Sequence, residues 1–297
     1  MTVGSSVAGE GGGEGAKHDD RLAERPERPD PLPIPVVDNH CHLDIQRDDA
    51  PVVTLAQALA EAAAVGVDRV VQIGCDIESA RWTAGIVDQH PALLGGVAIH
   101  PNEAPKHERA GDLDDVIDEI GSLAAHPRIR VIGETGLDYY RTGPEGVAAQ
   151  HHSFRRHIQL AKDLGLALQI HDRDSHDDIL RILAEEGAPE TTVLHCFSGD
   201  MEMARECVRR GYYLSFAGTV TFKSAKSLRN ALAVTPTEHL LVETDAPYLT
   251  PTPHRGRVNA PYLIPLTVRA MAATLNISVP QLCEALSANS EAVYGPW

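Results

Sequence analysis

Eight short apolar runs, spread along most of the chain, constrain the fold more than any other feature of this sequence. They are rich in aliphatic and β-branched residues and nearly continuous in apolar character, as strands are when helices cover both faces of a parallel sheet. Aromatic residues make up only 4% of the chain, so the core must be mainly aliphatic. The runs occupy residues 35–37, 69–73, 93–99, 129–132, 166–170, 191–194, 212–216 and 239–242.

Segments with helical signals separate the apolar runs. Thr54 and Gln57 form a capping-box pattern that opens an alanine-rich segment, and Gly66 suits the end of that helix. Residues 150–164 and 177–186 have helical patterns too, and each is followed by a glycine. Alternating strands and helices predict an α/β fold, a single-domain (β/α)8 barrel of the TIM type. An open doubly wound sheet is the alternative, but no GxGxxG sequence supports a dinucleotide site.

Residues 1–33 differ in composition from the rest of the chain. They are rich in Gly, Ser, Glu, Arg and Pro and hold too few apolar residues to offset the entropy of ordering. We therefore expect a disordered N-terminal tail over residues 1–33 and the barrel over residues 34–297. Neither a signal-peptide core nor an apolar run of membrane-spanning length occurs, which predicts a cytoplasmic protein without a membrane segment.

Charge and cysteine content narrow the class of protein further. The net charge of −16 excludes a protein that coats DNA mainly by counterion release. It leaves room for a nucleic-acid substrate, because a local basic or metal-lined pocket can bind phosphate inside an acidic shell. The five cysteines form no CxxC pair, so neither a disulfide framework nor a four-cysteine zinc site is expected.

Residues able to bind a metal follow most of the predicted strands. In a barrel of this type the reactive side chains lie at the carboxyl ends of the strands, so residues that follow different strands meet at one mouth. Imidazole and carboxylate groups together suit Zn²⁺, Mn²⁺ or Mg²⁺. The six candidate ligands are His40, His42, Glu134, His171, His195 and Asp245.

The number and spacing of these candidates predict two metal ions. His40 and His42 are one residue apart on a strand, so they face the same way. The same alternation turns Cys41 and Cys196 away from the centre, as small buried hydrophobes. Six ligands exceed the needs of one tetrahedral ion, and Glu134 has two oxygens with which to bridge a pair.

The expected division is His40, His42 and Asp245 on one ion and His171 and His195 on the other. A water between the ions would lose its proton near neutral pH and act as the nucleophile. Asp245 could hold a metal and also accept that proton. Glu134 and Asp245 are therefore the predicted catalytic residues.

Three further residues are candidates for substrate binding. Arg173 lies two positions after His171, so it should face the same side, where its guanidinium could grip a phosphate. Lys223 follows the seventh apolar run and could meet a phosphate as a point charge. Salt bridges to nearby acids are the alternative for both. His100 ends the third run, where substrate contact and a purely structural role are both open.

Six segments recur here in an order and spacing that resemble the TatD family of metal-dependent deoxyribonucleases, within the amidohydrolase-like barrels. The resemblance implies a TIM-type barrel, two divalent ions, and hydrolysis of DNA phosphodiesters, often from single-stranded or 3′ ends. It implies the ligand role for the same six residues and favours Arg173 near the substrate. The matching segments are residues 38–43, 133–140, 169–173, 195–199, 243–251 and 255–259.

Three positions depart from the family pattern. Asn39 replaces a threonine, but its side chain alternates away from the predicted metal. Asn102 stands where a second histidine is common after the third strand, and it cannot titrate, so an acid–base role there is in doubt. Val258 replaces a basic residue, which weakens phosphate contact.

Other functions remain open at this point. A related barrel hydrolase acting on a small ester, amide or aminoacyl linkage would use the same centre, because a metal polarises carbonyl and phosphoryl oxygens alike. A scaffold with a closed structural metal site is a third reading, but six ligands at a barrel mouth argue against it. No obligate protein partner is inferred.

Overall fold

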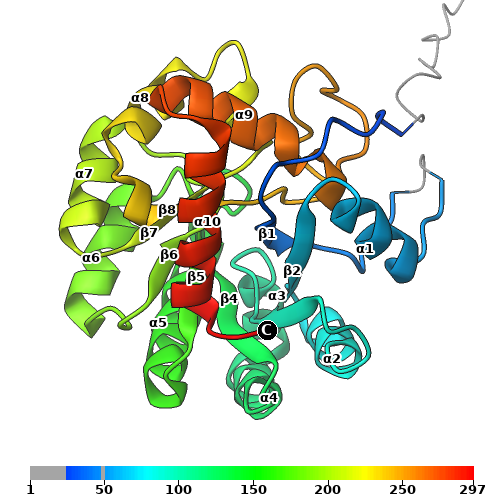
Figure 1. The fold of residues 1–297 in the computed structure, drawn as a ribbon. Coiled ribbons are helices and arrows are strands. Elements are labelled where there is room, and N and C mark those ends of the chain that lie inside the picture. Colours follow the sequence, from blue (N-terminus) through cyan, green and yellow to red (C-terminus); the bar gives the residue numbers. More distant parts are fainter. Residues whose placement is uncertain (1–24, 48–50) are drawn as a thin grey trace, which may run out of the picture.

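The computed structural model describes residues 25–47 and 51–297 of the chain. Eight parallel strands lie side by side in sequence order, and helices surround them (Figure 1). This arrangement confirms the predicted single-domain (β/α)8 barrel. The strands are β1 (Val36–Cys41), β2 (Val67–Gly74), β3 (Leu93–Val97), β4 (Ile129–Asp138), β5 (Ala167–Arg173), β6 (Thr192–Leu194), β7 (Tyr213–Phe216) and β8 (Leu240–Val242).

Hydrogen bonds between β1 and the end of β8 draw the two edges of the sheet together. Asn39 Nδ2 donates to Val242 O at 2.8 Å, and Asp245 N donates to His40 O at 2.9 Å. The buried Asp38 carboxylate accepts from Thr244 N at 2.9 Å. Asn39 therefore points away from the predicted metal, as alternation requires, and joins the first strand to the last.

Several helix ends lie where the sequence signals place them, but the first helix ends at Ala63 rather than at Gly66, and the fifth begins at Val147 rather than at residue 150. The Thr54–Gln57 capping box opens the first helix, and Gly165 ends the fifth with φ 65°. The helices are α1 (Leu55–Ala63), α2 (Ile77–Ile86), α3 (Ala104–Ala110), α4 (Leu113–Ala124), α5 (Val147–Leu164), α6 (His176–Glu186), α7 (Met201–Arg209), α8 (Lys226–Val234), α9 (Ile264–Leu275) and α10 (Val279–Tyr294). Short 3-10 turns cover Pro144–Gly146, Gly218–Thr221, Thr237–His239 and Pro261–Leu263.

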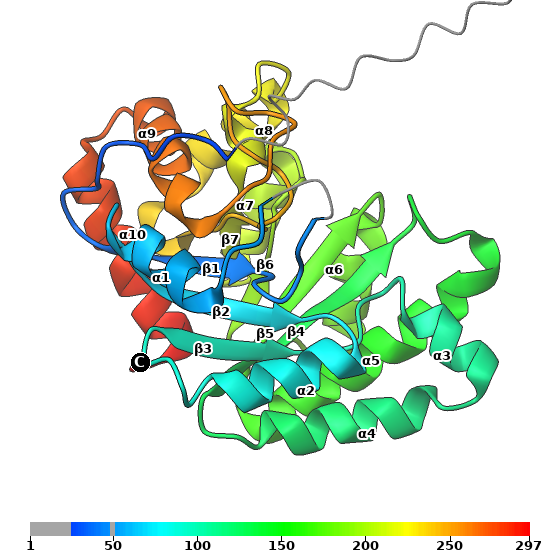
Figure 2. The same cartoon turned by 90° about the vertical axis from the view of Figure 1, so that its right-hand side faces the viewer.

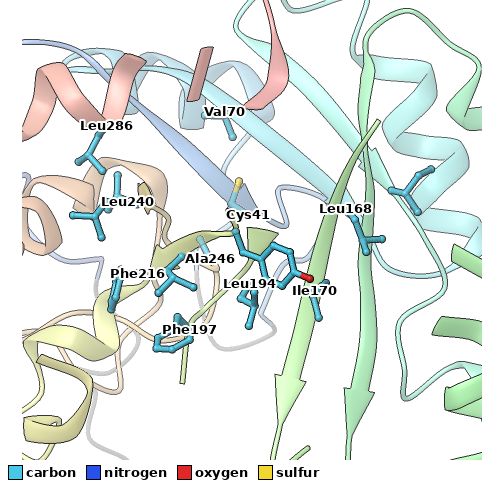
Figure 3. Packing of buried hydrophobic residues seen from close by; sticks show 14 of the residues in the cluster. Cys41, Val70, Leu168, Ile170, Leu194, Phe197, Phe216, Leu240, Ala246 and Leu286 are labelled. Carbon is cyan, nitrogen blue, oxygen red and sulfur yellow. The ribbon is translucent and has the colours of Figure 1, made fainter. Parts of the chain in front are cut away.

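Two buried apolar clusters hold the barrel together. The larger lies between the strands and the helices and includes Cys41, Leu194 and Phe216 (Figure 3). The smaller fills the barrel and includes Val37, Val193 and Tyr294 of α10. The strands point away from α10 (Figure 2), so α10 covers the amino ends of the strands and the opposite end carries the loops.

Two strands are longer than the apolar runs that predict them. β4 continues through Glu134 to Asp138, and β5 continues through His171 to Arg173. Polar residues extend these strands because they face the mouth of the barrel, where metal-binding and charged groups replace apolar packing. His171 therefore lies within the paired part of β5, whereas Glu134 lies at a shift in register of β4 between Ile132 and Thr135.

The predicted boundary between the tail and the barrel, at residue 33, lies too far along the chain. Residues 1–24 lie outside the described residues, but 25–33 pack against the barrel. Arg25 pairs with Glu61 of α1, Tyr262 Oη donates to Pro26 O at 2.8 Å, and Leu32 is buried. The apolar and arginine contacts of this short stretch offset its ordering entropy, which composition alone does not reveal.

Within the described residues, no individual helix combines the length and the apolar character needed to cross a membrane; only the pair Pro261–Leu275 and Val279–Tyr294, bent by 110°, passes that test together.

Candidate metal centre

The six predicted ligands come together at the carboxyl ends of the strands, although they span most of the chain. Glu134, on β4, lies at the middle of the group. Asp245 follows β8 in a left-handed backbone conformation (φ 54°), which turns its carboxylate towards β1. Oxygens of Glu134 lie 3.8 Å from His40 Nε2, 3.6 Å from His42 Nε2, 3.2 Å from His171 Nδ1 and 2.7 Å from His195 Nε2.

The first ligand group consists of His40, His42 and Asp245. Asp245 Oδ1 lies 3.3 Å from His42 Nε2 and 3.9 Å from His40 Nε2. The two Nε2 atoms are 3.3 Å apart, and Glu134 Oε1 faces both of them. All of these atoms approach one point from the strand ends of β1, β4 and β8.

The distal nitrogens of both rings show that this point suits a cation. His40 Nδ1 lies 2.7 Å from Gln169 Oε1, and His42 Nδ1 lies 3.0 Å from Ile73 O. Both partners can only accept, so each Nδ1 carries the hydrogen and each Nε2 presents a lone pair. Two lone pairs at 3.3 Å repel one another unless a cation lies between them. Ligand atoms on a tetrahedral zinc are about 3.3 Å apart, because each lies about 2.0 Å from the ion.

The pKa shifts show the same demand for positive charge. Burial alone lowers the pKa of His42, but the carboxylates of Asp245 and Glu134 outweigh it and raise that pKa to about 10. Burial raises the pKa of Glu134, yet the surrounding histidines hold it well below its usual range. In the metal-free chain a proton supplies the missing charge, and metal binding would release it.

The second ligand group consists of His171 and His195, which face Glu134 Oε2. His195 Nδ1 lies 3.2 Å from Glu243 Oε1, so a buried carboxylate orients this ring, and the same oxygen accepts from Cys196 N at 2.8 Å. His171 is less constrained. Its Nε2 lies 3.3 Å from Asp138 Oδ2 but forms no hydrogen bond within the described part of the chain.

Glu134 thus has one oxygen on each ligand group, which is the position predicted for a bridging carboxylate. The donor set of imidazole nitrogens and carboxylate oxygens, clustered within reach of a shared ion, fits one or more divalent metals. The individual ligand roles and the number of ions stay predictions.

His100 lies beside the second ligand group, with Nε2 3.8 Å from Glu134 Oε2. Its Nδ1 accepts a hydrogen bond from Asn102 N at 3.0 Å, so Nε2 carries the hydrogen. Burial lowers the pKa of His100 to about 3, which keeps the ring neutral. Distance alone would admit His100 as a ligand, but this hydrogen bond favours a role as N–H donor into the cavity.

One of the two cysteine predictions is wrong. Cys41 is buried in the outer core, as alternation predicts. Cys196 instead lines the cavity, because β6 ends at Leu194 and the backbone at Cys196 is left-handed (φ 42°), which breaks the alternation. Cys75, at the end of β2, was not predicted, and its thiol donates to Glu134 Oε1 at 3.2 Å.

The ligand groups open into a cavity of about 830 Å³. Five arginines line it together with the carboxylates of Glu134, Asp138, Asp172 and Asp245, although the chain as a whole carries a net charge of −16. Arg173 stacks on Tyr140, 4.0 Å from the ring centroid, and Arg255 stacks on Phe222 at 4.1 Å. The arginines that line the cavity are Arg47, Arg141, Arg173, Arg255 and Arg257.

Two of the three residues predicted to bind substrate line the cavity, and the third does not. Arg173 and His100 both line the cavity. Lys223 does not: it is exposed, and its neighbour Phe222 turns inward instead, beneath Arg255. A short 3-10 turn after β7, which the sequence did not signal, shifts the direction of the side chains that follow it. Arg255 and Arg257 supply the positive charge on this side.

Comparisons with known proteins agree with the fold and the site. A family described as TatD related DNase matches residues 37–295. A Mycobacterium tuberculosis protein described as an uncharacterized metal-dependent hydrolase TatD is 45% identical, over 88% of this chain and 98% of its own length. The Escherichia coli uncharacterized metal-dependent hydrolase YcfH is 35% identical, over 86% of this chain and 93% of its own.

Solved structures show the same fold. The crystal structure of the Escherichia coli TatD homolog YJJV has a TM-score of 0.79 at 24% identity, covering 87% of this chain and 97% of that one. The fold, the clustered metal-binding side chains and the relatives agree, and the chain belongs to the TatD family of metal-dependent hydrolases.

Proposed function

We propose that this protein is a metal-dependent deoxyribonuclease that hydrolyses DNA phosphodiester bonds, acting on single-stranded or 3′ ends as a 3′–5′ exonuclease. The observation that carries the proposal is the set of five arginines that line the cavity above the ligand groups. Such a concentration of positive charge in a chain of net charge −16 suits a substrate that brings several negative charges. The direction of cleavage rests on the family resemblance.

The roles of the residues follow from their positions. The two ligand groups, joined by Glu134, would hold divalent ions, which when bound polarise a phosphoryl oxygen and lower the pKa of water. Asp245 reaches the cavity and accepts the proton of the attacking water. His100 donates its Nε2 hydrogen to a phosphate oxygen, and Arg173 holds the phosphate with its guanidinium fork.

A cleavage assay tests the proposal. Chelator-treated protein is supplied with Mg²⁺, Mn²⁺ or Zn²⁺ separately and incubated with single-stranded DNA labelled at the 5′ end. We expect a ladder of products shortened from the 3′ end, and no ladder with the Glu134→Gln variant. No cleavage with any of these ions from acid to alkaline pH would rule the proposal out.

A small ester, amide or aminoacyl substrate is the second candidate. A cavity of about 830 Å³ lies within the size range of small-molecule pockets, and the net negative charge repels a long polyanion at a distance. This candidate predicts turnover of a small substrate that excess single-stranded DNA leaves unchanged. Competition by DNA at micromolar concentration would favour the nuclease instead.

A further inference from the structure

The amide of Gln169 lies inside the barrel, directly beneath the first ligand group. Gln169 is on β5, two residues before His171, and its side chain is fully buried. The interior cluster around this level of the barrel consists of side chains such as Val37, Val131 and Val193. Burying an amide among them costs free energy unless its hydrogen bonds are satisfied. Its partners therefore explain what the amide does.

Gln169 is fully bonded, and its orientation follows from its partners. Nε2 donates to the backbone carbonyl of Asn39 at 2.9 Å and to Tyr294 Oη at 2.7 Å. A carbonyl can only accept, so the amide nitrogen must face Asn39 and the amide oxygen must face His40. Oε1 then accepts from His40 Nδ1 at 2.7 Å. The orientation of this one amide therefore sets the tautomer of His40 and directs its Nε2 lone pair to the metal.

Tyr294 supplies the second acceptor, from the far end of the barrel. It is the last residue of α10, which lies across the amino ends of the strands, and its ring is buried. Without the Tyr294 hydroxyl, one amide hydrogen of Gln169 would be buried with no acceptor, and the amide would lose one of the three hydrogen bonds that fix its rotation. α10 also holds the same part of β1 through Ser290 Oγ, which donates to Asn39 Oδ1 at 3.0 Å.

We propose that Gln169 and Tyr294 are positioning residues for metal binding: through them, the C-terminal helix holds His40 in the tautomer and direction that the metal requires. The inference rests on the metal centre of the proposed function, but not on the choice of DNA as substrate. The residues act through His40 and touch neither the metal nor the substrate.

Metal affinity of the folded, metal-free protein is the first test. Isothermal titration with Zn²⁺ and with Mn²⁺ is compared for the wild type, Tyr294→Phe and Gln169→Leu. We expect each variant to bind the first ion about tenfold or more weakly, as the loss of a hydrogen bond behind a ligand does elsewhere. Gln169→Glu, which keeps an acceptor for His40 Nδ1, should recover part of the loss.

Tyr262→Phe is the matched control. It removes another buried tyrosine hydroxyl bond, to Pro26 O at 2.8 Å, on the outside of the barrel. We expect Tyr262→Phe to change the melting temperature of the metal-free protein and to leave metal affinity unchanged. If Tyr294→Phe behaves in the same way as this control, the hydroxyl serves packing alone and the proposal is wrong.

The tautomer provides a second readout, independent of metal and activity. In protein labelled with ¹⁵N-histidine, the wild-type His40 ring should show a protonated Nδ1, assigned by its loss in His40→Ala. In Gln169→Leu and Tyr294→Phe we expect a mixture of tautomers; an unchanged spectrum overturns the inference. A protein that binds metal through His40 as described but cleaves no DNA would contradict the proposed function and leave this inference standing.

Discussion

On the two sides of Glu134 the imidazole rings are held differently. His40 and His42 have side chains that are 0% and 3% exposed, and the distal nitrogen of each has an acceptor partner. The side chain of His171 is 18% exposed, and its Nε2 lies near Asp138 without a hydrogen bond. The first ligand group is therefore preorganised for an ion. In the second group, His195 is 3% exposed and is held by Glu243, so His171 is the ligand that opens to the cavity and can adjust with the substrate.

Glu134 has one oxygen on each ligand group, so replacing it should impair both groups at once. We expect Glu134→Gln to lower kcat on the order of 10³-fold, since the charge that gathers the ligands is lost. Steady-state hydrolysis measured at saturating metal checks this. A variant that keeps near-wild-type turnover would show that the two ligand groups work without a shared carboxylate.

Alanine substitutions of one histidine in each ligand group test whether the two groups bind metal differently. We expect His42→Ala to weaken binding of the first ion about 100-fold, and His171→Ala to weaken it by no more than about tenfold while weakening binding of any second ion. Stepwise isothermal titration of the metal-free variants separates the two effects. Equal losses in both variants would mean that the two sides form one undivided site.

His157, a buried histidine outside the metal centre, shows how burial shifts the pKa of an imidazole that has no neighbouring carboxylate. Burial lowers the pKa of His157 to about 4, whereas His42 beside Asp245 is raised to about 10. The unfolded chain protonates His157 below about pH 6.5, but the folded chain does so only below about pH 4. Folding stability from this group is therefore present above pH 6.5 and lost as the pH falls towards 4.

We expect this group to remove about 2 kcal/mol of unfolding free energy between about pH 7 and about pH 5. His157→Gln keeps an acceptor for Ile99 N, which His157 Nε2 accepts at 3.2 Å, and should flatten this part of the pH profile. Urea unfolding at each pH gives the difference between the two proteins. Parallel profiles would assign the acid sensitivity to other groups.

The smallest effect on kinetics is expected from replacing Arg173, which lines the cavity near His171. If the substrate is DNA, as proposed, Arg173→Ala should raise KM for single-stranded DNA about tenfold and change metal affinity little, because the proposed role of its guanidinium is to hold the phosphate and not the ion. Lys223→Ala is the matched control, since Lys223 is exposed and lies outside the cavity lining, and its kinetics should stay within about twofold of the wild type. A larger effect at Lys223 than at Arg173 would reverse the assignment.

The sequence was sufficient for the barrel and for the grouping of His40, His42 and Asp245, because strand ends and period-2 alternation are both visible in it. It was insufficient where a strand continues beyond its apolar run. β4 continues to Asp138, which faces the same way as Glu134. Because the predicted strand ended at residue 132, alternation could not be used to place Asp138 beside the ligands.

The sequence also indicates a residue that hydrogen-bonds to a histidine ligand, although it was not predicted. Gln169 lies two residues before His171 on β5, so alternation places it on the same face as a predicted ligand. Cys196, Arg141 and Arg255 carried no such signal, since left-handed turns and long loops set their directions and alternation does not extend into them.

The position of α10 across the base of the barrel has a consequence for the order in which the protein is made. A chain synthesised from its amino end presents His40 and His42 long before Asp245 exists, and Tyr294 emerges later still. A newly made chain thus exposes an isolated pair of metal-binding rings before the barrel can close around them. If α10 orients His40 through Tyr294 and Gln169, as we propose, this early pair becomes an oriented site only after the last helix has packed against the barrel.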